Sequence, residues 1–271
     1  MDPIITEYLA DRESTIEKLI ATAESKNDAV LFLLAGSHFC EKGMTDDITI
    51  SYLRRSLAIK PMAPAAYNAG YVYETRLRQR TSKNAKTDEE SMIALYLQSL
   101  ALGNPKAANQ LGWYFMEDNA RTFTFGSQQL TAENLLVLAA NKGVVQAVNN
   151  LINLYQNNPR KRFSARQRKY EITKDTMHLM EAMLDMLNSA YYGAYLKFIR
   201  QVSNTGDTSA ASFLKTPPGS QPGTCPICDT DGQLLVLQCK HPICVVCLER
   251  MMDTVTASYV KCPQCRAEIL M

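Results

Sequence analysis

The chain has 271 residues, with 29 lysines and arginines against 27 aspartates and glutamates. This balance gives no overall field that would draw the molecule onto nucleic acid or an anionic membrane, so charge alone names no partner. The first residues lack the basic start and apolar stretch of a secretory signal, and no apolar run approaches the roughly 20 residues that span a bilayer. We therefore expect a soluble, intracellular protein of the cytoplasm, with no membrane partner and room for one core and a second small module.

A short motif recurs through the first half of the chain, at spacings of 34, 42 and 40 residues. Its copies are LFLLAGSHF, AAYNAGYVY, AANQLGWYF and AVNNLINLY, which start at Leu31, Ala65, Ala107 and Ala147. Each copy has Ala or Leu four residues after its start, usually Gly next, and Phe or Tyr eight residues after its start. Positions four and eight residues apart lie on one face of a helix, so each copy predicts a helix.

A turn residue lies four residues before each copy, namely at Asn27, Pro61, Gly103 and Gly143. An alanine-bearing helical segment precedes each of these turns, and its small residues allow helices to approach closely. A helix, a turn and a second helix that recur at this period predict an α-solenoid.

The pattern resembles Sel1-like repeats, which are relatives of tetratricopeptide repeats, most clearly from Ala94 to Tyr155. Ile152 stands where that family usually has Gly, and the segments between copies vary in length. Stacked repeats leave a concave surface, so the resemblance implies that a protein substrate is recruited by these helices. A helical spacer or a dimerisation domain is the alternative.

Residues 160–169, RKRFSARQRK, carry six basic side chains around Phe163. Such a run can bind phosphates or act as a nuclear signal, but it is more often a solvated helix start, and nucleic acid is not an expected partner. The residues that follow have Met, Leu and Tyr at helical spacing and predict one or two further helices. His38, Cys40 and His178 fall in predicted helices without a second ligand at suitable spacing, so we interpret them as packing residues.

The segment 203–223 is rich in Ser, Thr, Gly and Pro, a composition typical of a flexible linker. It divides the chain into a helical repeat domain at 1–202, a linker at 203–223 and a C-terminal domain at 224–271. We expect the C-terminal domain to move independently of the helices.

Seven of the eight cysteines lie in that C-terminal domain, and only Cys40 lies elsewhere. Paired cysteines in an intracellular chain favour thiolate metal ligands over disulfides, and zinc takes four such ligands in a closed structural site. Eight ligands suit two zinc ions. The candidate ligands are Cys225, Cys228, Cys239, His241, Cys244, Cys247, Cys262 and Cys265.

The spacing C-x2-C-x10-C-x1-H-x2-C-x2-C-x14-C-x2-C, with histidine as the fourth ligand, resembles the RING family. The resemblance implies a cross-braced fold in which the first and third ligand pairs hold one ion and the second and fourth hold the other. One site is then Cys225, Cys228, Cys244 and Cys247, and the second is Cys239, His241, Cys262 and Cys265. A module of 48 residues is too small to fold on an apolar core alone, so it needs its metal. We expect a strand over 233–238 and a helix over about 245–254.

RING ligases bind a ubiquitin-conjugating enzyme charged with ubiquitin and present the thioester to a substrate lysine, without a covalent intermediate on their own chain. The resemblance assigns Ile227, Met251 and Pro263 to the groove that contacts the conjugating enzyme. Arg266, directly after the last ligand, matches the linchpin cation that contacts both conjugating enzyme and ubiquitin. Met251 stands where many relatives have tryptophan, which leaves the choice of conjugating enzyme open.

The sequence therefore predicts a mainly α protein, in which a helical-repeat domain precedes a small cross-braced RING domain with two Zn²⁺. The function that this resemblance implies is that of a RING-type E3 ubiquitin transferase, with a conjugating enzyme, ubiquitin and a protein substrate as partners. The alternative is a non-enzymatic adaptor that uses the zinc-stabilised domain for protein interaction.

Overall fold

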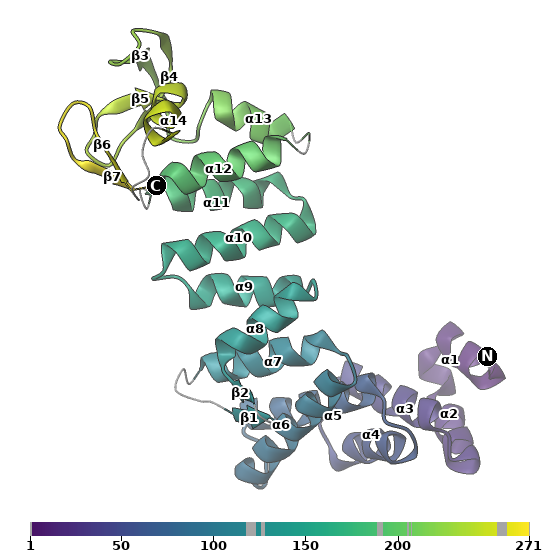
Figure 1. The fold of residues 1–271 in the computed structure, drawn as a ribbon. Coiled ribbons are helices and arrows are strands. Elements are labelled where there is room, and N and C mark those ends of the chain that lie inside the picture. The colour runs from purple at the N-terminus through teal and green to yellow at the C-terminus, as the bar shows by residue number, and fades with distance from the viewer. Residues whose placement is uncertain are drawn as a thin grey trace. The chain divides into compact units, whose positions relative to one another are not determined.

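The computed structural model describes residues 2–117, 123–125, 128–188, 192–204, 206, 208–253 and 259–270. The chain forms two compact units, Met1–Ala147 and Val148–Met271, which we call unit 1 and unit 2. Helices dominate both units, and a small cysteine-rich region with short strands ends the chain, which confirms the predicted fold class (Figure 1). Within the described part of the chain, no helix is both long and apolar enough to cross a membrane.

Unit 1 is built from consecutive helices and one short hairpin. Its helices are α1 (Pro3–Ala10), α2 (Arg12–Lys26), α3 (Ala29–Glu41), α4 (Asp47–Ile59), α5 (Ala63–Arg78), α6 (Ala85–Ala101), α7 (Pro105–Met116) and α8 (Ala132–Asn141). The antiparallel hairpin consists of β1 (Phe123–Phe125) and β2 (Gln128–Leu130). Helix α9 (Val145–Leu154) contains the boundary between the two units. The four motif copies lie on α3, α5, α7 and α9, as predicted.

Short polar side chains begin these helices, and left-handed residues end several of them. Asp28 accepts hydrogen bonds from the backbone N–H groups of Val30 and Leu31, at 2.8 and 3.1 Å. This contact satisfies donors that the first helical turn leaves free. Asn27, Gly103 and Gly143 have positive φ of 49°, 90° and 84°, a conformation that Asn and Gly adopt at low cost. The predicted turns are therefore confirmed at these positions.

The recurring glycine of the motif lies where one helix pair contacts the next. A Cβ atom on Gly36 of α3 would lie 2.6 Å from the side chain of Leu53 on α4. Cβ atoms on Gly70 and Gly112 would lie 2.9 Å from Tyr96 of α6 and 2.7 Å from Leu136 of α8, respectively. The glycine is therefore a packing requirement, because any side chain there would force the neighbouring helix outward.

A buried carboxylate joins three helices of unit 1. Glu74 of α5, only 2% exposed, accepts a hydrogen bond from the Tyr96 hydroxyl at 2.5 Å and pairs with Arg78 at 3.0 Å. Gln110 of α7 donates to the same carboxylate at 3.3 Å. Burial, together with the nearby Glu74 charge, raises the pKa of Tyr96 well above its ordinary value, so this hydroxyl stays a donor.

Unit 2 joins further helices to the cysteine-rich region. Its helices are α10 (Pro159–Thr173), α11 (Thr176–Asn188), α12 (Tyr192–Ser203), α13 (Thr208–Lys215) and α14 (Val245–Asp253). Its strands are β3 (Gln221–Thr224), β4 (Asp231–Val236), β5 (Pro242–Cys244), β6 (Tyr259–Lys261) and β7 (Glu268–Leu270). The antiparallel order is β3-β4-β5 in one sheet and β6-β7 in another.

The basic run lies on α10, where several of its cations pair with acidic residues. Arg162 and Arg166 both contact Asp185 of α11, at 2.9 and 3.0 Å, and Asp185 is only 6% exposed. Arg168 pairs with Glu171 one turn further along α10, at 3.0 Å. Part of the run is thus committed to helix packing, whereas the sequence analysis expected a solvated helix start.

The structure differs from the sequence expectation in the segment 203–223. Instead of a tether without structure, this segment contains helix α13 and most of strand β3, which pairs with β4. Ala210 is buried, and Phe213 and Leu214 pack against the same apolar cluster as the cysteine-rich region. The linker prediction relied on the polar composition of the segment, but these three apolar side chains are enough to pack α13 against the cluster.

His38 and Cys40 are packing residues, as the sequence interpretation has them. The His38 ring is 5% exposed, and its Nδ1 lies 3.2 Å from the Tyr8 hydroxyl. Burial raises the pKa of the Cys40 thiol to about 12, which leaves it protonated and unreactive near neutral pH. His178 lies 3.4 Å from Glu181 on α11, in a helix-surface contact.

Candidate metal centres and the surface around them

The candidate ligands lie on three short loops, at the end of β5 and in the first turn of α14. Cys225 and Cys228 follow β3, and Cys239 and His241 lie at the tip of the β4–β5 hairpin. Cys244 ends β5, and Cys247 lies in the first turn of α14, which starts at Val245. Cys262 and Cys265 lie between the paired strands β6 and β7.

These loops bring the eight ligands together as two separate groups of four. Cys225, Cys228, Cys244 and Cys247 form one group, and Cys239, His241, Cys262 and Cys265 form the other. Within each group the ligand atoms all lie within 4.8 Å of one another. Ligand pairs alternate between the groups along the chain, which confirms the predicted cross-braced arrangement.

The distances in both groups fit tetrahedral zinc. With zinc–sulfur bonds of about 2.3 Å and zinc–imidazole bonds of about 2.0 Å, tetrahedral angles separate two sulfurs by about 3.8 Å and a sulfur from a nitrogen by about 3.5 Å. Cys228 Sγ lies 3.8 Å from Cys244 Sγ, and His241 Nδ1 lies 3.7 Å from Cys262 Sγ. All eight cysteines of the chain are described, and none is in a disulfide.

The thiol pKa values differ among the ligands: burial raises those of Cys239, Cys244 and Cys247, whereas hydrogen-bond donors lower others. Thr230, whose hydroxyl and backbone N–H face the sulfur, lowers the pKa of the Cys228 thiol to about 6. Burial opposes ionisation of Cys262, but the backbone N–H groups of Cys265 and Gln264 lower its pKa to about 7. Thiolates are the form that zinc binds, so these groups favour the metal-binding state. Four protein ligands per ion leave no open position for water, which makes both sites structural.

The two CxxC loops share one backbone geometry, which the sequence analysis did not identify. In the first loop, the Asp229 N–H donates to the Cys225 carbonyl at 2.9 Å. In the second loop, the Arg266 N–H donates to the Cys262 carbonyl at the same distance of 2.9 Å. Asp229 and Arg266 are both left-handed, with φ of 52° and 64°. Aspartate tolerates this conformation, but arginine gives no local signal of it.

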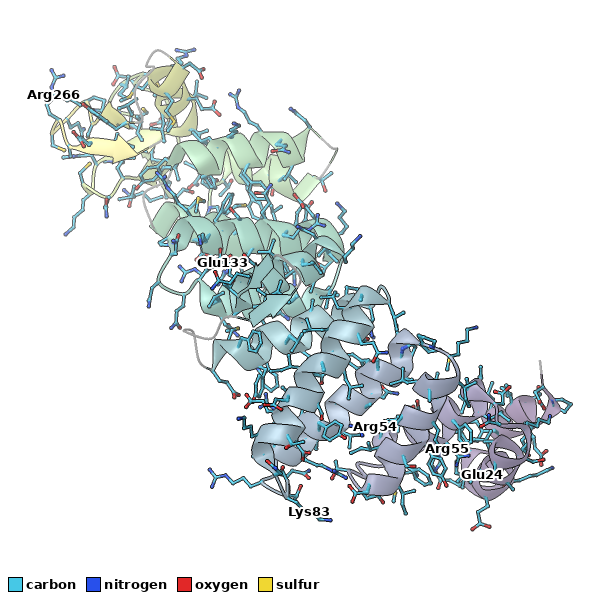
Figure 2. The ribbon with its side chains drawn as sticks, turned by 60° about the horizontal axis from the view of Figure 1, so that its bottom comes forward. Glu24, Arg54, Arg55, Lys83, Glu133 and Arg266 are labelled. Atoms are coloured by element: carbon cyan, nitrogen blue, oxygen red, sulfur yellow. The ribbon has the colours of Figure 1, made fainter. Side chains whose placement is uncertain are left out.

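The residues assigned to the conjugating-enzyme groove lie on these two loops and on α14. Ile227, just before the second cysteine of the first loop, is 43% exposed, and Pro263, just after the first cysteine of the second loop, is also exposed. Arg266 lies at the outer edge of the zinc-ligand region with its side chain in solvent (Figure 2). Met251 is half-buried against the apolar cluster of unit 2.

Comparison with known proteins finds a RING finger protein that is similar to a short stretch of the chain. The chain is 39% identical over 70 residues to the RING finger protein nhl-1 of Caenorhabditis elegans. That alignment covers 21% of this chain and 7% of the nematode protein, so the similarity is limited to a short stretch of each. No protein-family model matches the chain, and the Sel1-like resemblance of the helices therefore rests on the motif copies alone.

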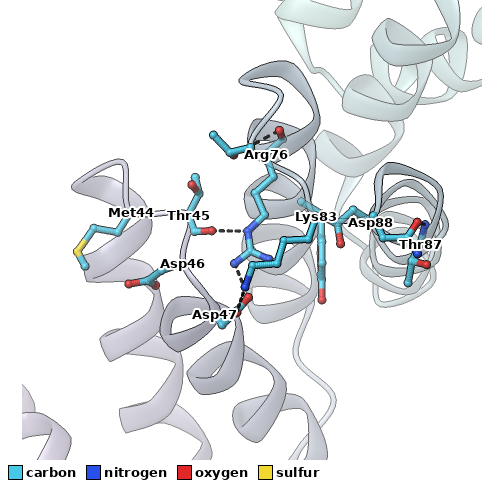
Figure 3. Close-up of a pocket in the computed structure, with 11 residues that line it drawn as sticks. Met44, Thr45, Asp46, Asp47, Arg76, Lys83, Thr87 and Asp88 are labelled. Carbon is cyan, nitrogen blue, oxygen red and sulfur yellow. Dashed lines mark hydrogen bonds and ion pairs between the residues drawn. The ribbon is translucent and has the colours of Figure 1, made fainter.

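Unit 1 carries a groove that the sequence analysis did not find. Two adjoining hollows of about 680 and 520 Å³ share Asp47 and Tyr73 in their linings. Arg76 lies at the centre of the larger hollow, where it donates to the Thr45 carbonyl and to Asp47 at 2.8 Å (Figure 3). Lys83 approaches the same carboxylate to 3.7 Å and is otherwise in solvent.

Two arginine side chains lie close to the Tyr73 ring in this groove. The guanidinium carbons of Arg54 and Arg76 are 5.6 and 5.8 Å from the ring centroid. Arg54 is exposed and lines the smaller hollow, and among the described residues it forms no ion pair. The Tyr73 ring is only 6% exposed, so the groove offers a partner chiefly the Arg54 guanidinium, next to a larger hollow that also carries Asp46 and Asp88.

Proposed function

We propose that this protein is a RING-type E3 ubiquitin transferase. The observation that supports this most is the cross-braced pair of four-ligand groups, with Ile227, Pro263 and Arg266 exposed around them. Closed zinc sites offer no catalytic water, so the contribution to catalysis is positional. The chain binds the charged conjugating enzyme, and the substrate amine attacks the thioester held there.

Each residue of the proposed groove has a role that its chemistry fits. Ile227 and Pro263 offer exposed apolar contacts from two loops of the same backbone geometry. Arg266 leaves its loop from a backbone that two hydrogen bonds fix, between Arg266 and Cys262 and between Cys262 and Ala267, at 2.9 and 2.8 Å. A planar guanidinium with several donors can bridge two bound proteins, which lysine does less well.

The test is ubiquitin transfer by the purified full-length protein with a panel of conjugating enzymes. We expect chain formation with at least one enzyme, and a loss of about tenfold or more in Ile227→Ala and in Arg266→Ala. Val236→Ala and Lys240→Ala are matched controls, because they truncate an exposed aliphatic and an exposed left-handed cation outside the groove. A folded protein with two zincs that supports no transfer would favour the adaptor function instead.

We further propose that the groove of unit 1 recruits the protein substrate through an acidic side chain. Arg54, whose guanidinium lies near the mostly buried Tyr73 ring, would bind the carboxylate of a target segment. The test compares ubiquitinated proteins in cells that express the wild type or Arg54→Glu. Loss of particular targets with unchanged self-ubiquitination supports the proposal, and an unchanged set of targets contradicts it.

A further inference from the structure

Helix α12 packs directly against the zinc-binding region, which lies far from it in the sequence. Tyr192, Leu196, Ile199 and Val202 of α12 belong to one buried cluster with residues of the cysteine-rich region. The members from that region include Leu234, Leu235, Leu237, Ile243, Leu248, Val260 and Ile269. The apolar core around the zinc ligands therefore extends into the helices, and the region 224–271 is not a separate core.

Polar contacts fix the same interface at two points. Arg200 of α12 forms a two-pronged ion pair with Glu249 of α14, at 2.8 and 2.5 Å. The Glu249 side chain is only 15% exposed and the Arg200 side chain is 59% exposed, so the carboxylate is shielded from water while the guanidinium reaches it from the surface. Tyr192 of α12 donates its hydroxyl to the Val236 carbonyl at 3.5 Å, and Tyr195 donates to the Phe213 carbonyl of α13 at 3.2 Å.

An open groove lies beside the ion pair. It has a volume of about 570 Å³ and lies between α12 and α14, with Leu196 and Met252 among the residues that line it. Apolar packing is therefore incomplete at this end of the interface. The Arg200–Glu249 pair is the direct contact that holds α14 there, because bidentate charge-assisted hydrogen bonds fix both distance and orientation.

The helices leave the proposed conjugating-enzyme surface uncovered. Glu249 and Met252, three positions apart on α14, face the groove toward α12. Val246 on the same helix is 54% exposed, and Ile227 is 43% exposed. The contact with α12 is thus compatible with a bound partner and supports α14 from a different side.

We propose that α12 and α13 form a fixed brace for the zinc-binding region, and that Arg200 and Glu249 are positioning residues for α14. The brace sets the orientation of the helix that carries Met251 and ties the zinc loops to α12. Its consequence for catalysis rests on the proposed ligase function, whereas its effect on α14 does not. A charged conjugating enzyme is then held at one fixed orientation relative to the helices of unit 2.

The experiment uses the full-length protein with Arg200→Glu, Glu249→Arg and the double charge swap. Lys197→Glu is the matched control, because Lys197 is an exposed cation one turn earlier on α12 and borders the same groove. The first readout is amide hydrogen exchange in α14, which needs no conjugating enzyme. The second is the discharge of ubiquitin from a charged conjugating enzyme to free lysine.

We expect each single variant to keep two zincs and to exchange the amides of α14 several-fold faster. The rate of ubiquitin discharge should fall about tenfold, because a small misplacement of a binding helix slows the reaction that it positions. The charge swap should restore both readouts, and Lys197→Glu should change neither. If a single variant loses zinc, Arg200→Gln takes its place in the comparison. Unchanged exchange in the single variants, or a double variant no better than either, overturns the brace. Wild type without discharge, but with the exchange pattern above, overturns only the ligase function.

Discussion

The helical unit 1 and the zinc-binding region of unit 2 stabilise a buried core in different ways. Each is assembled from segments too short to bury a core alone. Unit 1 is stabilised by close helix contacts, because Gly36, Gly70 and Gly112 leave room for a side chain of the next helix. The zinc-binding region is held by its metal ligands and packs against the apolar face of α12. Regular stacking spreads stability over many contacts, whereas the zinc-binding region concentrates it in a few.

Loss of a zinc ligand should give the largest effect. Cys228→Ser removes one thiolate of four, and structural zinc contributes on the order of 10 kcal/mol to small domains of this kind. We expect the variant to bind less than two zinc equivalents and to lose the structure of the zinc-binding region while unit 1 stays folded. Metal analysis and amide exchange measure the two outcomes.

The matched control for that experiment is Cys40→Ser, which alters the cysteine that lies outside both ligand groups. It should retain both zincs. A Cys228→Ser protein that holds two zincs with normal amide protection would show that packing against α12, and not the metal, stabilises this region.

Asp185→Ala tests whether the helical part of unit 2 also depends on one concentrated contact. The change leaves Arg162 and Arg166 without the nearly buried carboxylate that both contact. We expect a loss of about 3 kcal/mol in the free energy of unfolding, since isolating partly buried charges is costly. Urea unfolding measures it. Glu171→Ala, which breaks an exposed pair with Arg168, should cost under about 1 kcal/mol. Equal effects of the two changes would contradict the prediction.

Gly112→Ala tests the distributed packing of unit 1. The added methyl would lie 2.7 Å from Leu136 and 3.2 Å from the Ala132 carbonyl, which is backbone and cannot easily move. Overpacking costs about 1–3 kcal/mol, and this opposes a gain of up to about 1 kcal/mol in helix propensity. We expect a net loss of about 1 kcal/mol in urea unfolding of unit 1. At Gly232 a Cβ meets nothing within 4 Å, so Gly232→Ala should show no such loss. A stabilised Gly112→Ala protein would contradict the close-contact interpretation.

The smallest expected effect is the pH dependence that the buried Cys40 thiol gives to the stability of unit 1. Burial raises the pKa of Cys40 to about 12, against about 8.5 in an unfolded chain. This thiol therefore leaves the stability of unit 1 unchanged below about pH 8.5 and lowers it as pH rises toward the folded value. At pH 8, iodoacetamide should label Cys40 slowly in the native protein and quickly in urea, as peptide mass spectrometry measures. Rapid native labelling would show that α3 opens readily.

Much of the local structure could be predicted because its signals are local. The eight ligands stand at spacings visible in the sequence, and the motif copies mark α3, α5, α7 and α9. Helix α14 at Val245–Asp253 lies close to the predicted helix over 245–254. The predicted strand over 233–238 is displaced by two residues, since β4 is Asp231–Val236. The error lies at a boundary, where periodicity is least informative.

Local spacing was enough to predict the metal ligands, the helix pairs and the turns between them, because each signal depends on residues a few positions apart. The need for a small residue at Gly112 is visible only in the folded chain, since its cause is Leu136 on another helix. The same holds for the segment 203–223, whose order comes from packing against the zinc-binding region. Arg200 and Glu249 are 49 positions apart, so no local pattern could have paired them. Contacts of this kind depend on the path of the whole chain, and short-range periodicity carries no information about that path.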